Sequence, residues 1–298
     1  MTRHVPAPFP LCAALLLAAS AAGAEKLSLS FAGSTYQDAK EVALRTPEGV
    51  ACTDQGAVLV ADSGNGRLLN YKYKEGVFSL VSEVKFPQLG YPVRVQIDSS
   101  GNALSLDQRT RRIVRVGASG FAGYLEPTDV PGAAPFPVAF KIDKKDGVWL
   151  LDLTSQRVLS LDPAGKFLRA VPLPKGSFTD LAVDAQGRLF VVEAISATLF
   201  SAGPQDAELK PLGKSLKGYM SFPMYVAVAD HGFLLLVDRH GNGLVAVGPD
   251  GAFLGRRLSI GRQDGFLYYP SQLCLSDGGD AFVADRGNNR VQAFTVQR

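Results

Sequence analysis

Short apolar runs alternate with polar, glycine-rich turns along the chain from about residue 47 onward, and six of these runs end in an acidic residue. One such run is Val58 to Ala61 before Asp62, and another is Phe282 to Ala284 before Asp285. The six acids lie 45, 45, 41, 45 and 47 residues apart. Fifteen residues before each acid stands a proline, except before the fourth acid, where Phe178 takes its place. A spacing this regular identifies six repeats of one unit.

Each repeat predicts a sheet of short antiparallel strands. In the first strand of every repeat, the third and fifth residues after the proline position are apolar, as in Val95 and Ile97, and alternation places the two on one face. A period of about 46 residues with glycine-rich turns is the size of one four-stranded propeller blade. We therefore predict an all-β fold, a six-bladed β-propeller. Its blades start near residues 47, 92, 137, 178, 223 and 270.

The last repeat is one strand short, because its final apolar run, residues 293–296, is followed by only two residues. The segment 25–33 precedes the first repeat, and its residues Leu27 to Phe31 alternate between apolar side chains and serine. An unpaired strand edge is open to wrong partners, and propellers avoid such edges by closing the ring. We predict that this N-terminal strand closes the last blade.

The repeats resemble the NHL repeat. The resemblance rests on residues 47–51 (Pro-Glu-Gly-Val-Ala) together with residues 60–67, and on residues 282–294. It extends over roughly residues 47–298 and is weakest in the fourth repeat. It implies a six-bladed propeller. It leaves the function open, because related six-bladed propellers include enzymes with a central metal as well as binding modules.

The first 24 residues predict a signal peptide. Arg3 is followed by the apolar run Leu11 to Ser20, and Ala22-Gly23-Ala24 supplies the small residues that signal peptidase needs. A retained anchor is the alternative, but the run is shorter than a membrane span requires. We expect residues 1–24 to be removed and residues 25–298 to be exported to the periplasm or the medium, with no membrane span.

Charge and composition exclude two further classes of protein. Arg3 is the only charged residue in the signal, so the remaining 30 basic and 28 acidic residues leave a net charge of about +2. A domain with so little excess charge lacks the basic surface of a nucleic-acid-binding protein, and we predict no nucleic-acid partner. The hydrophobic share of 46% is too high for a disordered chain.

Two cysteines remain after the signal, which contains Cys12. Cys52 and Cys274 lie in the first strands of the first and last repeats, which the closed ring makes neighbours. An oxidising compartment allows a disulfide between them, but a disulfide requires Cα atoms within about 7 Å. Adjacent inner strands are often farther apart, so we favour two buried free thiols.

The residue inventory limits the chemistry. After the signal only His231 and His240 remain, both in polar turn sequence, so three imidazoles cannot hold one metal. This argues against a site like that of the amidated-peptide lyases, which use a histidine-bound metal. A site like that of the gluconolactonases, with carboxylates and amides around a divalent ion, stays open. We predict no catalytic residues, no metal and no cofactor.

Polar residues stand on the second face of the first strands, where we expect the central channel. These residues either only line a water-filled channel or form a small binding site of mixed charge. In that site Lys141 and Asp180 supply paired charges and Tyr225 supplies a stacking surface, so replacing Asp180 and Tyr225 would weaken binding and leave the fold intact. The candidate ligand-binding residues are Arg94, Gln96, Lys141, Asp180, Tyr225 and Gln272.

Two further sets of residues recur with the repeat. Aromatic residues precede the proline and either pack under the loops or form an aromatic rim for a peptide or sugar. They are Tyr91, Phe136, Phe222 and Tyr269. An arginine five residues after the acid predicts structural pairs that brace the turns. These pairs are Asp62 with Arg67, Asp107 with Arg112, Asp152 with Arg157, and Asp285 with Arg290.

These observations predict an exported, monomeric, non-catalytic binding module. Its partner would be a protein, a polysaccharide or a small polar ligand. The alternative is a metal-dependent enzyme of the lactonase, hydrolase or lyase kind. Fold alone does not decide between them.

Overall fold

The computed structural model describes residues 1, 27–117, 120–229 and 232–297. The signal peptide predicted over residues 1–24 lies outside these ranges apart from Met1, and so does His231. Among the described residues, no helix is long and apolar enough to cross a membrane.

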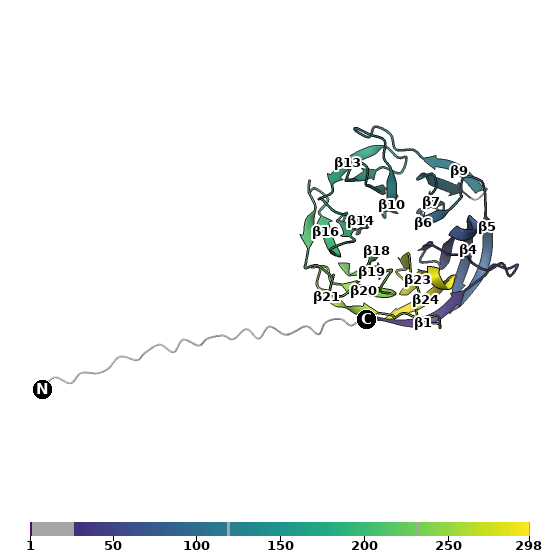
Figure 1. Cartoon of the computed structure of the whole chain (residues 1–298). Coiled ribbons are helices and arrows are strands. Elements are labelled where there is room, and N and C mark those ends of the chain that lie inside the picture. The colour runs from purple at the N-terminus through teal and green to yellow at the C-terminus, as the bar shows by residue number, and fades with distance from the viewer. Residues whose placement is uncertain (2–26, 118–119, 230–231, 298) are drawn as a thin grey trace.

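Six four-stranded antiparallel sheets stand around a common axis as the blades of a propeller, which confirms the predicted fold (Figure 1). Blade 1 contains β2 (Gly49–Cys52), β3 (Ala57–Asp62), β4 (Arg67–Lys74) and β5 (Val77–Val84). Blade 2 contains β6 (Pro92–Ile97), β7 (Ala103–Asp107), β8 (Ile113–Gly117) and β9 (Gly120–Leu125). Blade 3 contains β10 (Pro137–Ile142), β11 (Val148–Asp152), β12 (Arg157–Leu161) and β13 (Phe167–Pro172).

The other three blades follow the same plan, with strands in chain order from the axis outward except that β1 is the outermost strand of blade 6. Blade 4 contains β14 (Phe178–Val183), β15 (Leu189–Glu193), β16 (Thr198–Ala202) and β17 (Lys210–Leu212). Blade 5 contains β18 (Pro223–Val228), β19 (Leu234–Asp238), β20 (Gly243–Val247) and β21 (Phe253–Arg257). Blade 6 contains β22 (Leu273–Leu275), β23 (Asp280–Asp285), β24 (Arg290–Gln297) and β1 (Ser28–Thr35). Short 3-10 turns η1 (Ser63–Asn65) and η3 (Arg286–Asn288) follow β3 and β23.

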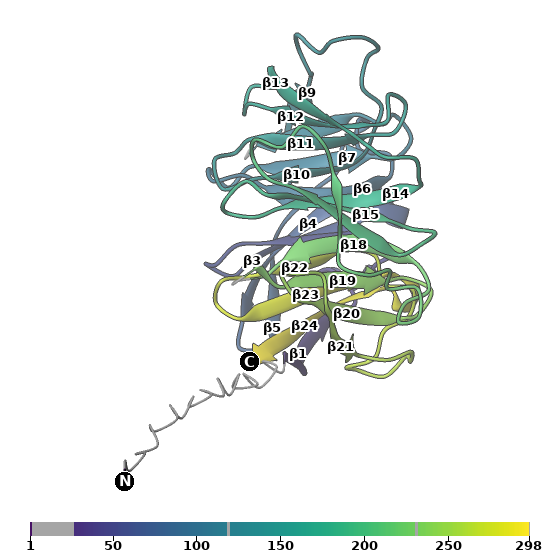
Figure 2. The same cartoon turned by 90° about the vertical axis from the view of Figure 1, so that its left-hand side faces the viewer.

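The N-terminal strand closes the ring as the sequence predicts. β1 pairs antiparallel with β24, from Ser28 opposite Gln297 to Thr35 opposite Val291. Both views place the two strands side by side at the outer edge of blade 6 (Figures 1 and 2). The last blade is therefore built from both ends of the chain.

The hydrophobic core consists of six layers, each between two neighbouring blades. Strand β2 contributes to two of these layers. On one face of the strand Val50 packs with Phe282 of blade 6, and on its other face Ala51 packs with Val95 of blade 2. The two faces of each inner strand thus look toward the two neighbouring blades. The expectation was that one face of each inner strand lines the channel. Instead that face packs against the next blade, and only the ends of its long polar side chains reach the axis.

The acid at the end of the second strand ties each blade together. We call these six residues the turn acids. Each carboxylate accepts a hydrogen bond from a backbone N–H just before the inner strand of its own blade, as from Tyr91 to Asp107 at 2.6 Å and from Phe222 to Asp238 at 2.8 Å. In blades 2, 3 and 5 the next residue is the proline, which has no N–H to satisfy, so the strand can begin there without an unpaired donor. In blades 1 and 6 the donor stands two residues before the proline. This contact accounts for the fixed spacing of proline and acid. The turn acids are Asp62, Asp107, Asp152, Glu193, Asp238 and Asp285.

Three of the four predicted acid and arginine pairs form ion pairs between the arginine Nε and the acid Oδ2. They are Arg67 with Asp62 at 2.7 Å, Arg157 with Asp152 at 3.0 Å, and Arg290 with Asp285 at 2.7 Å. The prediction of the fourth pair, Asp107 with Arg112, was wrong. Asp107 instead accepts the backbone N–H groups of Arg109 and Thr110, while Arg112 pairs with Glu126 of the outer loop.

The two blades without the arginine have local replacements. In blade 5, Arg256 of the outer strand pairs with Asp238 at 2.6 Å, and the space is free because residue 243 is glycine. In blade 4, Glu193 accepts hydrogen bonds from the backbone N–H groups of Ser177 and Ser196. The departures in these blades therefore have structural compensations and do not by themselves indicate a functional site.

A disulfide joins Cys52 of β2 and Cys274 of β22, whose Cα atoms are 5.9 Å apart. The expectation of two free thiols was wrong, because the two strands come close together near the axis. Blades 1 and 6 are thus held at the axis by a covalent bond, while β1 completes the outer edge of blade 6.

Deleting residues 27–31 should expose the edge of β24 and produce aggregation and a lower melting temperature, because an unpaired hydrophobic edge recruits other strands. Size-exclusion chromatography and thermal unfolding check this against the chain that lacks only residues 1–24. A deletion variant that is monomeric with an unchanged melting temperature would refute the closing role of β1.

Titrating thiols in denaturant should find none in the chain without its signal before reduction, and two after it. Because the disulfide spans 222 residues, its reduction should lower the free energy of unfolding by roughly 5 kcal/mol on the chain-entropy estimate. Two reactive thiols before reduction would contradict the bond.

Candidate functional site

Side chains from five blades meet at the axis and fill it. We call Arg94, Lys141, Asp180, Tyr225 and Gln272 the central plug. All five are buried, and Asp180 and Gln272 are fully so. The structure therefore brings together five of the six predicted ligand-binding residues. The sixth, Gln96, is half-buried and lies two residues after Arg94 on β6.

Asp180 is the anion at the middle of the plug. Its Oδ2 lies 3.2 Å from Nζ of Lys141, and its Oδ1 lies 3.9 Å from Nε of Arg94. Burial raises the pKa of Asp180 above its usual range, while the two nearby cations act in the opposite direction. The Lys141 ammonium also lies 3.3 Å from the ring centroid of Tyr225.

The plug also joins blades that are not neighbours. Gln272 of blade 6 donates from Nε2 to the Val95 carbonyl of blade 2 at 2.9 Å, passing blade 1 where residue 49 is glycine. Arg94 of blade 2 donates to the Met224 carbonyl of blade 5 at 3.2 Å. These bonds cross the ring, so the plug braces the propeller at its narrowest part.

Asp180 and Tyr225, the two residues expected to contact a ligand, are placed differently: Asp180 lies inside the plug, whereas Tyr225 also lines the cavity described below. Asp180 is fully buried and engaged by two cations, and Tyr225 is 3% exposed with its ring covered by Lys141. Because Asp180 is the anion of a buried cluster, we now predict that replacing it destabilises the fold; that Asp180 and Tyr225 contribute to binding stays a prediction. The carboxylate of Asp180 faces the cations of the plug and is not accessible to a solute.

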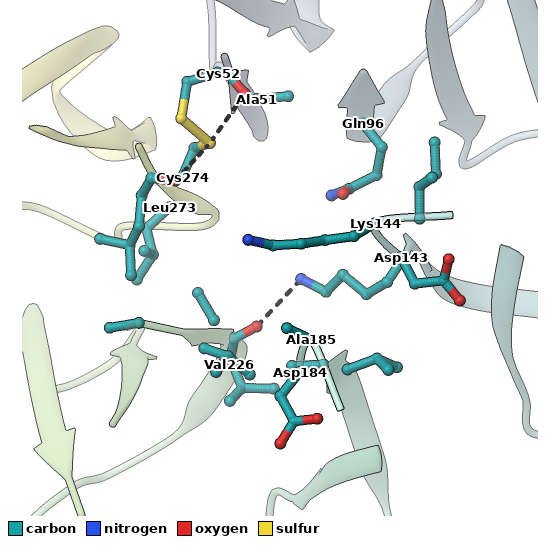
Figure 3. Close-up of a pocket in the computed structure, with 18 of the residues that line it drawn as sticks. Ala51, Cys52, Gln96, Asp143, Lys144, Asp184, Ala185, Val226, Leu273 and Cys274 are labelled. Atoms are coloured by element: carbon teal, nitrogen blue, oxygen red, sulfur yellow. Dashed lines mark hydrogen bonds between the residues drawn. A yellow bond between two sulfur atoms is a disulfide. The ribbon is translucent and has the colours of Figure 1, made fainter. Parts of the chain in front are cut away.

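Above the plug, on the face where the inner strands end, lies a cavity of about 650 Å³. We call this face the exit face and the cavity the exit cup. Its wall includes Gln96, Lys141, Lys144, Gln186 and the disulfide. In Figure 3, Lys144 reaches into the cup from the β10–β11 turn and Gln96 points toward it from β6. Cavities of this size hold small molecules.

Three acids border the described part of the exit cup: Asp143 and Asp184 are occupied by their own turns, and Asp277 faces Lys144. Asp143 accepts hydrogen bonds from the backbone of Lys145 and Gly147 and from the Trp149 indole, and its carboxylate turns away from the cup (Figure 3). Asp184 accepts from the backbone of Gln186 and Arg188 in the same manner. The groups left to meet a solute are mainly donors: the Lys144 ammonium, 3.7 Å from Asp277, and the Gln96 amide. Sequence reasoning missed Lys144 because it lies in a turn.

The predicted aromatic rim lies on the opposite face, where the inner strands begin, which we call the entry face. Phe222 stacks on His240 with ring centroids 4.9 Å apart, and Tyr269 meets the same imidazole edge-on at 5.9 Å. Phe136 is exposed and lies against Arg111, while the Tyr91 hydroxyl lies 3.4 Å from that of Thr46. His240, which the sequence suggested only as an exposed turn residue, thus joins two rim residues.

The central residues do not fit a divalent metal. The described residues contain no group of three or more histidine, cysteine or acidic side chains that could hold one. The two carboxylates closest to the axis are both occupied by cations, Asp180 by the plug and Glu48 by Arg239 and Arg286. A gluconolactonase-like metal would have to displace these cations, so no chemistry is assigned to it.

The fold is shared with known enzymes. A streptogramin B lyase aligns with a TM-score of 0.63 and 12% identity over 91% of this chain and 98% of its own. A gluconolactonase of Xanthomonas campestris aligns with a TM-score of 0.67 and 16% identity over 90% and 97%. A virginiamycin B lyase of Staphylococcus aureus gives 0.60 and 14% over 91% and 99%. No curated protein matches the sequence.

At these identities the likeness concerns the fold alone. The model of the NHL repeat matches residues 267–294, which contain β22, β23 and the turn acid Asp285. The chain thus contains an NHL repeat at residues 267–294, in the last blade of a six-bladed β-propeller.

Proposed function

We propose that the protein is an exported binding protein whose exit cup holds a small polar ligand without catalysing a reaction. The observation that carries this proposal is the pair of accessible donors above the central plug: the Lys144 ammonium, which is exposed and lies 3.7 Å from Asp277, and the Gln96 amide. Because Asp143 and Asp184 are occupied by their turns, the cup favours a ligand rich in hydrogen-bond acceptors, such as a sugar or sugar acid.

Export is supported by two independent features. The first is the signal-like sequence of residues 1–24. The second is the disulfide between Cys52 and Cys274, since disulfides persist in oxidising compartments and are rare in the cytosol. Both favour a place in the periplasm or outside the cell.

The second candidate function is that of a lactonase-, hydrolase- or lyase-like enzyme. It is favoured by the fold comparisons, because the structural neighbours are lyases and gluconolactonases. Against its metal-dependent form stands the occupation of Glu48 and Asp180 by cations. Release of acid from gluconolactone that is abolished by a chelator would establish this candidate and replace the binding proposal.

Replacing Lys144 by Gln should weaken sugar or sugar-acid binding at least fivefold, because it removes the cup's charged donor. Glucose and gluconate are suitable probes, followed through the amide NMR signals of residues 96 and 144. Lys145→Gln is the matched control, since Lys145 is the exposed neighbour in the same turn and does not line the cup. Equal binding by the two variants, or no shift of these signals with either probe, would contradict the proposal.

Replacing Asp180 by Asn should lower the free energy of unfolding by roughly 3–5 kcal/mol, because it leaves two buried cations without their anion. Urea denaturation measures the loss. Asp129→Asn is the control, because it breaks the exposed pair with Lys166 and should cost less than about 1 kcal/mol. If Asp180→Asn were as mild as the control, the plug would not brace the ring.

A further inference from the structure

The entry face carries a second group of charged residues at the axis, on the side of the plug opposite the exit cup. Glu48 precedes β2, Ser271 precedes β22, and Arg239 and Arg286 each follow a turn acid, at the ends of β19 and β23. We call Glu48, Arg239 and Arg286 the arginine mouth. The three residues come from three blades, so only the closed ring brings them together.

Both arginines bind the same carboxylate. Oε2 of Glu48 lies 2.6 Å from Nη2 of Arg239, and Oε1 lies 2.5 Å from Nε of Arg286. The Ser271 hydroxyl donates to Oε2 at 2.6 Å. Glu48 is buried, whereas the side chains of Arg239 and Arg286 are 19% and 33% exposed. The guanidinium groups are therefore the part of the mouth that solvent reaches.

Positive charge exceeds negative charge along the axis. Glu48 faces two arginines, and Asp180 below it is shared between Arg94 and Lys141, so four cations meet two anions. Burial, together with the charges of Arg94 and Arg286, lowers the pKa of Arg239 although Glu48 opposes this. The buried Nε of Arg239 has no hydrogen-bond partner among the described residues. A second anion would balance the excess positive charge and would offer an acceptor to Arg239.

Residues of the aromatic rim stand near the two arginines. Against the effect of burial, Glu48 and Tyr91 raise the pKa of Arg286. Phe222 and Tyr269 pack on His240, the residue that follows Arg239. The backbone N–H of Arg239 donates to the Phe222 carbonyl, and the ring of Phe222 stacks on His240, the next residue in the turn. Tyr269 lies against the other edge of His240 and is 38% exposed. A flat group attached to an anion would meet these rings.

We infer that the arginine mouth binds the carboxylate of a small organic acid that carries a flat or ring-shaped group. The two guanidinium groups would hold the carboxylate by charge-assisted hydrogen bonds, as arginine does elsewhere in bidentate pairs. Glu48 then acts as an internal competitor, because it occupies the same two arginines. The site lies on the other face from the exit cup, so it goes beyond the proposed function and stands or falls separately.

Benzoate is a direct probe, with benzyl alcohol as its uncharged counterpart and acetate as the carboxylate without a ring. Titrations at constant ionic strength, followed by the amide signals of residues 239 and 240, should show benzoate binding at least tenfold more tightly than either. Inorganic phosphate should bind more weakly than benzoate, since it offers no ring. Equal shifts with benzoate and benzyl alcohol, no shift with benzoate, or tighter binding of phosphate would overturn the inference.

Two variants give changes of opposite sign. Arg239→Gln should weaken benzoate binding at least tenfold, whereas Glu48→Gln should strengthen it several-fold, because the competing carboxylate is gone. Arg109→Gln, in an exposed turn of blade 2, is the control and should leave binding unchanged. Circular dichroism verifies that each variant is folded. Weaker binding by folded Glu48→Gln, or unchanged binding by folded Arg239→Gln, would show that the cluster is only structural.

Discussion

The architecture depends on the hydrogen bond that a backbone N–H ahead of each inner strand donates to a turn acid. It fixes the start of the inner strand relative to the end of the second strand, as Asp107 does for Tyr91 in blade 2. A buried carboxylate needs such partners, and a strand that begins with proline needs its preceding N–H satisfied. One contact thus meets both needs in blades 2, 3 and 5, where the donor directly precedes the proline. Six blades set in this way bring their inner strands to a common axis.

Convergence at the axis places charged and polar side chains in a narrow space. In the plug, the anion Asp180 lies between two cations and so balances part of their charge. Gln272 and Arg94 donate hydrogen bonds to distant blades. The consequence is a propeller with two separate faces. The exit cup offers donors from Lys144 and Gln96, and the arginine mouth offers guanidinium groups beside aromatic rings.

The sequence predicted the repeating parts well for physical reasons. Apolar alternation, prolines and acids recur at fixed spacing because every blade solves the same packing problem, and the closing strand followed from a missing partner. The parts that depend on contacts across the ring could not be predicted. The pairing of Lys141 with Asp180 was predicted, but the distance between Cys52 and Cys274 and the meeting of Glu48 with Arg239 depend on how far side chains reach in the closed ring. The Asp107 and Arg112 pair failed because the outer loop supplied Glu126 instead.

The central claim is that cations, and not a metal, occupy the carboxylates at the axis. A crystal structure of the protein grown with Mn²⁺, with anomalous diffraction data, tests it most directly. The account predicts Lys141 beside Asp180, both arginines on Glu48, and no anomalous peak near either carboxylate. A manganese ion coordinated by Glu48 or Asp180, with the cations displaced, would contradict it and favour the enzyme.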